Sequence, residues 1–269
     1  MTPESIRRYI SAITIFLHLL SERKISPLSA DRHLLKEFIH KRRTSGGKTG
    51  AGIAQKTLEN DLSAISCFYE YLTFEGYIPY NPVPAVRKRY LMRYKDAEGD
   101  NTPRKLISVE EMAMLINSIL DTRDKAIATL LAKTGVRRGE MISLDIDDLQ
   151  WEEQSITLKA KRFKKRSGRI VFFDDECARI MKRWLKMRES MKPKTKALFL
   201  NENRNRLDRN GIYSLITKHA QKVGLHNSES DRTEDHFSPH CFRHWFTTHL
   251  RRSGMNREFI KELRGDKRR

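Results

Sequence analysis

The chain has 269 residues, of which 53 are Lys or Arg and 34 are Asp or Glu, so its formal net charge is +19. The apolar fraction of 38% is enough for a folded core and argues against global disorder, and no apolar run is long enough to cross a membrane. A positive excess of this size predicts a polyanionic partner, most commonly nucleic acid, although a basic ribosomal factor would share it.

The start of the sequence lacks the basic, apolar and small-residue order of a signal peptide, which favours a cytoplasmic protein. The cysteines Cys67, Cys177 and Cys241 are odd in number and far apart. This pattern is typical of reduced thiols and not of a disulfide scaffold.

Residues 1–84 are predicted to form a helical N-terminal domain. The first helix is expected to carry its core face on apolar residues that alternate spacings of four and three: Ile6, Ile10, Ile13, Leu17 and Leu20. Two further helices are expected at about 30–43 and 54–74, separated by a glycine-rich loop. The prolines at 79, 82 and 84 are expected to stop the last of these helices.

Residues 85–106 are predicted to be a basic linker between two domains, because helical periodicity is lost there and positive charge accumulates. Arg87, Lys88 and Arg89 lie at its start. We expect these three side chains to contact DNA phosphates.

Residues 107–269 are predicted to form a second domain that is mainly helical with a small β-hairpin. A capping box from Ser108 to Glu111 marks its first helix. Helices are then expected at about 109–120, 123–133, 175–190, 209–223, 239–252 and 256–264, and the strands of the hairpin at 155–159 and 169–173.

Residues 238–244, which read Ser-Pro-His-Cys-Phe-Arg-His, are the most informative stretch. Ser238 suits a helix N-cap and Pro239 the first helical position, which places His240 and Arg243 on one face of the first turns. A guanidinium there can grip two phosphate oxygens, and an imidazole beside it can move a proton at neutral pH. The motif predicts phosphate chemistry, although an ordinary capped helix with one buried histidine would fit it equally well.

Residues 134–140, which read Thr-Gly-Val-Arg-Arg-Gly-Glu, shift this balance. A glycine turn follows a helix, Arg137 opens the next one, and Glu140 lies three positions on to hold it. Alone this is a helix junction with a surface arginine. Together with the later motif it supplies a second guanidinium for the same phosphate.

The two stretches resemble the two signature boxes of the tyrosine recombinases, the phage-integrase family, in both order and interval. The resemblance is closest in character to archaeal and viral integrases. It implies an N-terminal helical, SAM-like core-binding domain followed by a catalytic domain. It further implies site-specific recombination or integration of double-stranded DNA through a 3′-phosphotyrosine, with no cofactor and no metal, in a prokaryotic or viral host cell. It also implies a homo-oligomer, a tetramer on DNA for the full-length protein and a monomer for a shortened one.

The histidines at 236, 240 and 244, with Cys241 beside them, have a spacing that could suggest zinc. Arg243 lies on the same helical face and would repel a cation, and no second cluster of ligands follows elsewhere. We therefore expect no metal at this position.

The resemblance implies a role for each matching residue. Arg137 and Arg243 match the arginines that neutralise the scissile phosphate, and His240 matches the histidine that assists proton transfer. Lys161, which follows the first strand of the hairpin, best matches the lysine that protonates the leaving 5′-oxygen, with Lys164 and Lys165 as rivals. The basic hairpin residues are also expected to contact DNA phosphates: Arg162, Lys164, Lys165 and Arg166.

Two departures from the family pattern follow. Asp266 lies where the family usually has the histidine of a Leu-Gly-His box, and we regard it as a candidate site residue. The nucleophilic tyrosine is expected near position 275, whereas the sequence stops at Arg269 and its last tyrosine is Tyr213. We therefore expect this polypeptide to bind DNA without cleaving it. The alternatives are a non-catalytic DNA-binding regulator on a recombinase scaffold and, less well supported, an RNA-binding or ribosomal protein.

Overall fold

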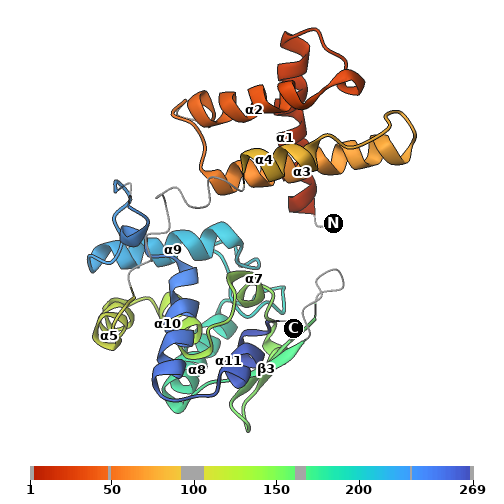
Figure 1. Cartoon of the computed structure of the whole chain (residues 1–269). Coiled ribbons are helices and arrows are strands. Elements are labelled where there is room, and N and C mark those ends of the chain that lie inside the picture. The colour runs from red at the N-terminus through yellow and green to blue at the C-terminus, as the bar shows by residue number, and fades with distance from the viewer. Residues whose placement is uncertain (1–2, 48–49, 92–105, 161–167, 231, 267–269) are drawn as a thin grey trace. The chain divides into compact units, whose positions relative to one another are not determined.

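The computed structural model in Figure 1 describes residues 3–47, 50–91, 106–160, 168–230 and 232–266. The chain divides into two compact units, Met1–Asp100 and Asn101–Arg269. Among the described residues no helix has the length and apolar character needed to span a membrane. The architecture is mainly helical with one small sheet, as the sequence predicts.

The first unit is a helical bundle. Its described elements are α1 (Pro3–Glu22), η1 (Pro27–Ser29), α2 (Arg32–Ser45), α3 (Gln55–Phe74) and α4 (Val83–Tyr90). Asp31 caps α2 by accepting hydrogen bonds from the backbone N–H groups of His33 and Leu34. The rings of Phe16 and Phe38 meet edge to face in the core, with their centres 5.3 Å apart.

The buried face of α1 differs from the predicted one. Ile6 and Ile10 are 44% and 58% exposed, and burial along α1 begins only at Ala12. Phe16, which the predicted face omitted, is fully buried. The first turns of α1 therefore lie outside the core of the first unit, so their apolar spacing does not correspond to packing within that unit.

The start of the predicted linker is a helix in the structure. In α4, Val83 and Val86 are buried against α2 and α3, and Leu91 after it is buried as well. Proline removes a backbone donor that the first turn of a helix does not use, so Pro84 fits in the first turn of α4, where the sequence analysis expected helical structure to stop. The rest of the predicted linker, 92–105, lies outside the described residues, and its bounds stay a prediction.

The second unit surrounds the apolar helix α6. Its helices are α5 (Val109–Ser118), α6 (Thr122–Thr134), α7 (Arg138–Met141), η3 (Ile146–Asp148), α8 (Asp175–Ser190), α9 (Arg209–Lys222), η4 (Thr233–Asp235), α10 (Pro239–Arg252) and α11 (Arg257–Arg264). Helix α6 packs against α8, α10, α5 and α9. Its consecutive residues from Ala126 to Ala132 are all buried, as expected for a helix that is covered all round.

Three short antiparallel strands lie beside the helices of the second unit. They are β1 (Leu149–Gln150), β2 (Ser155–Leu158) and β3 (Arg169–Phe172), in the order β1-β2-β3. Ile156 pairs with Val171, and both are buried. Strands β2 and β3 form the predicted hairpin, whereas β1 was not predicted, because two residues are too few for an alternating pattern. Helix α11 packs against β3, which brings the end of the described chain close to the start of that strand.

Candidate active site

Helix α10 begins with a local cap that orients the residues of the later motif. Ser238 is the N-cap, and its backbone N–H donates to Cys241 Sγ at 3.3 Å. Pro239 occupies the first helical turn, as predicted. His240 is exposed, whereas Arg243 three positions on is only 3% exposed. One turn of helix thus places the imidazole at the surface and the guanidinium inside.

The glycine turn of the earlier motif packs directly against α10. Gly135 ends α6 with φ +58°, and a Cβ there would lie 2.4 Å from the ring of Phe246. Only glycine allows both the left-handed backbone and this close approach. Arg243 Nη1 then donates to the Gly135 carbonyl oxygen at 2.9 Å. The two motifs, about a hundred residues apart in sequence, are locked together by this contact.

Arg137 is held from two sides. Its backbone N–H donates to Glu140 Oε2 at 2.8 Å, and its Nη1 donates to Glu140 Oε1 at 3.1 Å. The same Nη1 reaches the Arg264 carbonyl oxygen at 2.7 Å, and Nη2 reaches Asp266 Oδ1 at 2.8 Å. Glu140 therefore does hold Arg137 in the structure, and the end of α11 completes the arrangement.

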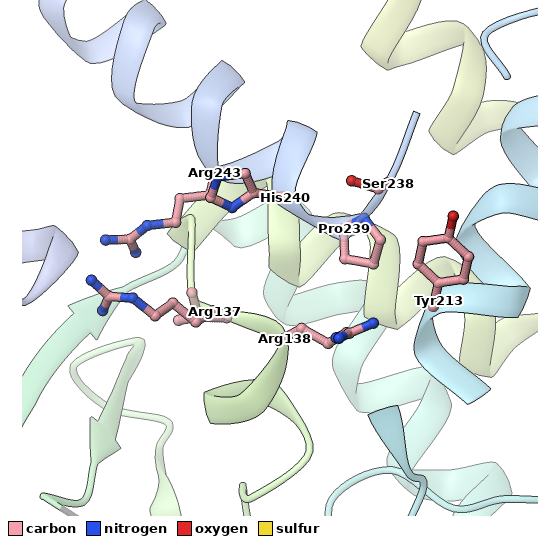
Figure 2. A pocket seen from close by; sticks show the side chains of 8 residues that line it. Arg137, Arg138, Tyr213, Ser238, Pro239, His240 and Arg243 are labelled. Atoms are coloured by element: carbon pink, nitrogen blue, oxygen red, sulfur yellow. The ribbon is translucent and has the colours of Figure 1, made fainter. Parts of the chain in front are cut away.

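Arg243 shares those partners at the end of α11. Its Nη2 donates to the Arg264 carbonyl oxygen at 2.7 Å and lies 3.4 Å from Asp266 Oδ1. Figure 2 shows the side chains of Arg137 and Arg243 extending side by side. Two guanidinium groups thus converge on one carbonyl and one carboxylate oxygen. Acceptors at these positions show that the pair can grip an anionic oxygen with several donors at once.

The electrostatics of the pair also favour an anion. Burial, together with the charges of Arg137 and Arg264, lowers the pKa of the Arg243 guanidinium, and Asp266 and Glu140 only partly oppose this shift. A lowered pKa means that the folded site disfavours this third positive charge. An anion bound between the arginines would relieve that cost, which is the property expected of a phosphate site.

Arg169 belongs to the same network, and the sequence analysis did not single it out. Its Nη1 and Nη2 donate to the two oxygens of Glu140 at 3.0 and 2.9 Å, and its Nε donates to the Leu263 carbonyl oxygen at 2.6 Å. Its side chain is 7% exposed. Arg169 at the start of β3 therefore ties Glu140, and through it Arg137, to the end of α11.

The charge of Glu140 is stabilised by this network. Burial raises the pKa of its carboxyl, but hydrogen bonds from Arg169 and from the Arg137 backbone, with the charges of both arginines, outweigh burial and hold the pKa at about 2. Glu140 is therefore ionised at neutral pH. Its position behind Arg137 fits a residue that orients the guanidinium and does not touch the substrate.

A pocket of about 330 Å³ opens beside the arginines. It is lined by Val136, Arg137, Arg138, Tyr213, Ser238, Pro239, His240 and Arg243. The ring of His240 lies edge to face with that of His244, with centres 4.5 Å apart. The Arg138 guanidinium lies 6.0 Å from the centre of the Tyr213 ring. The predicted site residues Arg137, His240 and Arg243 therefore line one pocket, and Asp266 contacts its two arginines.

The remaining candidates lie either outside the described residues or in the first unit. Lys161, the expected proton donor, lies outside the described residues. So do the hairpin residues expected to contact DNA: Arg162, Lys164, Lys165 and Arg166. Arg87, Lys88 and Arg89 belong to α4 of the first unit, where Lys88 and Arg89 are exposed.

The described part of the chain contains no group of three or more His, Cys, Asp or Glu side chains arranged to hold a metal ion. His236 is engaged elsewhere, because its Nε2 lies 2.6 Å from the Ser230 carbonyl oxygen. The Cys241 thiol accepts the hydrogen bond that closes the cap of α10. His236 and Cys241, two of the residues with apparent zinc spacing, therefore take part in the local structure around α10.

Comparisons with known proteins agree with this geometry. A model described as the phage integrase family matches residues 106–268, and one described as the N-terminal SAM-like domain of phage integrases matches residues 1–76. The first match alone spans more than half of the chain. The chain belongs to the phage integrase family. The archaeal or viral character that we expected is not tested by these matches.

Relatives within the integrase family match almost the whole of this chain. The chain is 24% identical over 268 residues to tyrosine recombinase XerC of Haemophilus influenzae (strain PittEE), covering 98% of this chain and 83% of that protein. It is 26% identical over 277 residues to XerC of Alcanivorax borkumensis (strain ATCC 700651 / DSM 11573 / NCIMB 13689 / SK2), covering 94% and 84%.

Solved structures of other integrases have the same fold. The Tn1549 transposon integrase in complex with transposon right end DNA matches with a TM-score of 0.79 at 18% identity, covering 98% of this chain and 86% of that one. A lambda integrase dimer bound to a COC′ core site matches with a TM-score of 0.71 at 13% identity, covering 100% and 70%. At these identities the likeness concerns the fold alone.

Proposed function

We propose that this protein carries the DNA-binding and phosphate-activating parts of a site-specific tyrosine recombinase. The observation that carries the proposal is the convergence of Arg137 and Arg243, whose Nη atoms both lie 2.7 Å from the Arg264 carbonyl oxygen. His240 lines the pocket beside them. Membership of the phage integrase family, two family relatives named tyrosine recombinases and the large positive charge support it.

In the proposed reaction a tyrosine oxygen attacks the phosphorus of a DNA phosphodiester. The bond from phosphorus to the 5′-oxygen breaks, a 3′-phosphotyrosyl bond forms, and the 5′-oxygen leaves as a hydroxyl after gaining a proton. The reverse attack, by the 5′-hydroxyl of another strand, rejoins the DNA. No co-reactant is needed, because each phosphodiester bond that breaks is replaced by another.

Each pocket residue has a proposed part in this reaction. Arg137 and Arg243 donate to the non-bridging oxygens, whose negative charge grows in the pentacoordinate transition state. His240, exposed at the pocket rim, accepts the proton of the attacking phenol and returns it in the reverse step. Lys161 protonates the leaving 5′-oxygen, with Lys164 and Lys165 as alternatives. Asp266 and Glu140 position the arginines.

The nucleophile is proposed to be a tyrosine outside residues 1–269, near position 275. The last tyrosine within these residues, Tyr213, lines the pocket and contacts Arg138. In Figure 2 its ring lies on the far side of the pocket from the guanidinium groups of Arg137 and Arg243, and its hydroxyl does not point toward them. Water is a poor substitute, since the pocket would orient a tethered phenol and not water.

The proposed partners are double-stranded DNA and further copies of the same protein. The Tn1549 integrase is described in complex with transposon right end DNA, and lambda integrase as a dimer bound to a core site. We propose a tetramer on DNA for the protein that includes the nucleophile and a monomer for residues 1–269 alone. A non-catalytic DNA-binding regulator on the same scaffold is the second candidate.

Covalent trapping separates the two candidates. A polypeptide of residues 1–269 and one extended through the tyrosine near 275 are each incubated with a nicked duplex of the cognate site. The recombinase proposal expects a denaturant-resistant DNA adduct only with the longer polypeptide, and none after its tyrosine is changed to Phe. Specific binding without an adduct in both polypeptides would favour the regulator. An adduct with residues 1–269 that Tyr213→Phe abolishes would make Tyr213 the nucleophile.

A further inference from the structure

We propose that the exposed face of α8 is a second binding surface for the phosphate backbone of duplex DNA, separate from the candidate active site. We define this basic face by four residues: Arg179, Lys182, Arg183 and Lys186. All four side chains are exposed. Their spacings of three and four residues place them on one side of the helix, and the opposite side packs into the core through Met181 and Trp184. Helix α8 is labelled in Figure 1.

The cations of the basic face have no carboxylate partners among the described residues. No ion pair includes any of the four, although salt bridges are frequent elsewhere in the same unit. Like charges three and four positions apart on a helix repel one another. A helix with four unpaired cations on one face is therefore less stable, unless a bound anion offsets the repulsion between them.

Other charged residues of α8 are used within the fold. Arg188 is buried, and its guanidinium donates to the carbonyl oxygens of Thr195 and Ala197. Glu176 in the first turn pairs with Lys133 at 2.7 Å. The fold therefore uses these groups but leaves the basic face without carboxylate partners in the part of the chain that the structure describes, which is the pattern expected of a surface for an anionic ligand.

The basic face is part of a groove and not of a flat surface. A hollow of about 630 Å³ is lined by all four of its residues, and α6 adds a fifth cation, Lys125, while α5 adds the amide of Asn117. Lys182 Nζ also lies 5.5 Å from the centre of the Trp151 ring. Five cations from two helices thus surround one concave site whose only carboxylate, Glu176, is already paired with Lys133.

This groove is separate from the candidate active site. Its lining residues come from α5, α6 and α8, whereas the pocket with Arg137 and Arg243 is lined from α7, α9, α10 and the segment before them. Helix α6 packs against both α8 and α10. The two sites share no lining residue, so DNA in this groove would contact side chains that DNA at the arginine pair does not.

The chemistry of the groove favours a phosphodiester backbone over a protein partner. Its four helical cations extend over eight residues, a rise of about 10 Å, which is long enough to meet successive phosphates. The lining offers Ile180 as its one apolar side chain, too little for the buried apolar centre of a protein interface. Exposed lysines and arginines also bind phosphates without regard to base sequence.

The inference rests on the proposed DNA-binding function, and its test is a bridging assay. One duplex of the cognate site is immobilised, the protein is bound, and a second, labelled duplex of unrelated sequence is added. The test variant is R179Q/R183Q/K186Q, whose glutamines preserve helix propensity. The matched control, R251Q/R252Q/R257Q, removes three exposed cations from α10 and α11 of the same unit, so the change in net charge is equal.

We expect the test variant to hold the immobilised duplex like the control but to recruit at least several-fold less of the second duplex. For binding to unrelated duplex, the log–log salt dependence should flatten by roughly 2–3 in the test variant and by less than about 1 in the control, since each phosphate contact contributes about 0.9. Circular dichroism spectra that superimpose exclude misfolding.

Equal recruitment of the second duplex by both variants would overturn the inference. Binding of polyglutamate by the unmodified protein and the test variant is measured as well. A test variant that loses polyglutamate binding but keeps binding of the second duplex would also overturn the inference, because the groove would then be a site for an acidic protein. Failure of the proposed function is distinguishable, because it would remove binding of the first duplex by the unmodified protein.

Discussion

The candidate active site and the basic face of α8 both contain arginines, but their environments are opposite. Arg137 and Arg243 are enclosed, and their Nη atoms meet fixed acceptors on Gly135, Arg264 and Asp266. Arg179 and Arg183 are exposed and have no ion pair among the described residues. A buried, prearranged guanidinium loses little freedom when it meets a transition state, whereas an exposed one can follow a backbone of any sequence.

The difference predicts separate consequences of substitution at the two surfaces. Changes at the enclosed arginines should affect the rate of strand cleavage and the stability of the fold. Changes on the basic face of α8 should affect only the strength and the salt dependence of DNA binding.

The largest effect is expected from Arg243→Ala in a polypeptide extended through the nucleophilic tyrosine. Cleavage of a nicked duplex should fall by about a thousandfold or more, because the lost guanidinium acts on charge that develops in the transition state. Equilibrium binding of the same duplex should change far less. Single-turnover cleavage and a gel-shift titration measure the two quantities. A loss of binding as large as the loss of cleavage would contradict the assignment.

The next effect concerns Arg169, which acts through Glu140. Arg169→Gln leaves the Glu140 carboxylate without its bidentate partner, and the free energy of unfolding should fall by about 3 kcal/mol in a urea titration. The double variant Arg169→Gln/Glu140→Gln should regain most of that stability, because no uncompensated charge remains. Its cleavage rate should nevertheless stay low, since Arg137 has lost its support. Recovery of both properties together would leave Arg169 a purely structural role.

These contacts mark the limit of what the sequence could predict. The two motifs identified Arg137, His240 and Arg243 because caps and helical spacing are local properties, visible in consecutive residues. Arg169 was missed because its partners, Glu140 and the Leu263 carbonyl, lie 29 and 94 residues away in sequence. Backbone carbonyl acceptors depend on the path of the chain and not on the type of residue.

The same distinction explains where the predicted fold was right and wrong. The helices expected at 175–190 and 239–252 have those bounds, since each begins with a capping side chain and a clear periodicity. Helix α4 was mistaken for linker, because Pro84 and three basic residues obscured the buried pair Val83 and Val86. The predicted buried face of α1 was partly wrong, because periodicity shows that a helix face is apolar but not which residues pack against it.

A third effect tests the charge of Glu140 through pH. Its pKa is about 2 in the folded protein, below the ordinary value of 4.5, so its contribution to stability is present above about pH 4.5 and is lost as pH falls toward 2. With allowance for partial exposure, on the order of 2 kcal/mol should disappear across that window. Urea titrations at several pH values measure it. In Glu140→Gln the acid-dependent loss should be smaller by this amount, and an unchanged profile would contradict the assignment.

A smaller effect is expected from Asp266→Asn. The carboxylate lies 2.8 Å from Arg137 Nη2 and competes with any anion for the arginine pair. Its neutralisation should tighten the binding of sulfate and of a phosphodiester by several-fold, because the amide can still accept a hydrogen bond but carries no opposing charge. Isothermal titration with sulfate measures the change. Weaker binding in the variant would mean that positioning of the arginines by Asp266 outweighs its competition with bound anions.

The smallest effect returns to α8 and tests whether its cations act one by one. A single Arg183→Gln substitution removes one exposed charge that has no partner in the described residues, so neither the stability of the fold nor the cleavage rate should change measurably. For unrelated duplex DNA, the log–log salt slope should flatten by roughly 0.9, the value for one phosphate contact.

The buried Arg188 of the same helix provides the control substitution. Arg188→Gln should reduce stability, because two backbone carbonyls lose their donor, yet it should leave the salt slope unchanged. If the two substitutions changed the slope equally, the basic face would be contributing general charge and not defined phosphate contacts.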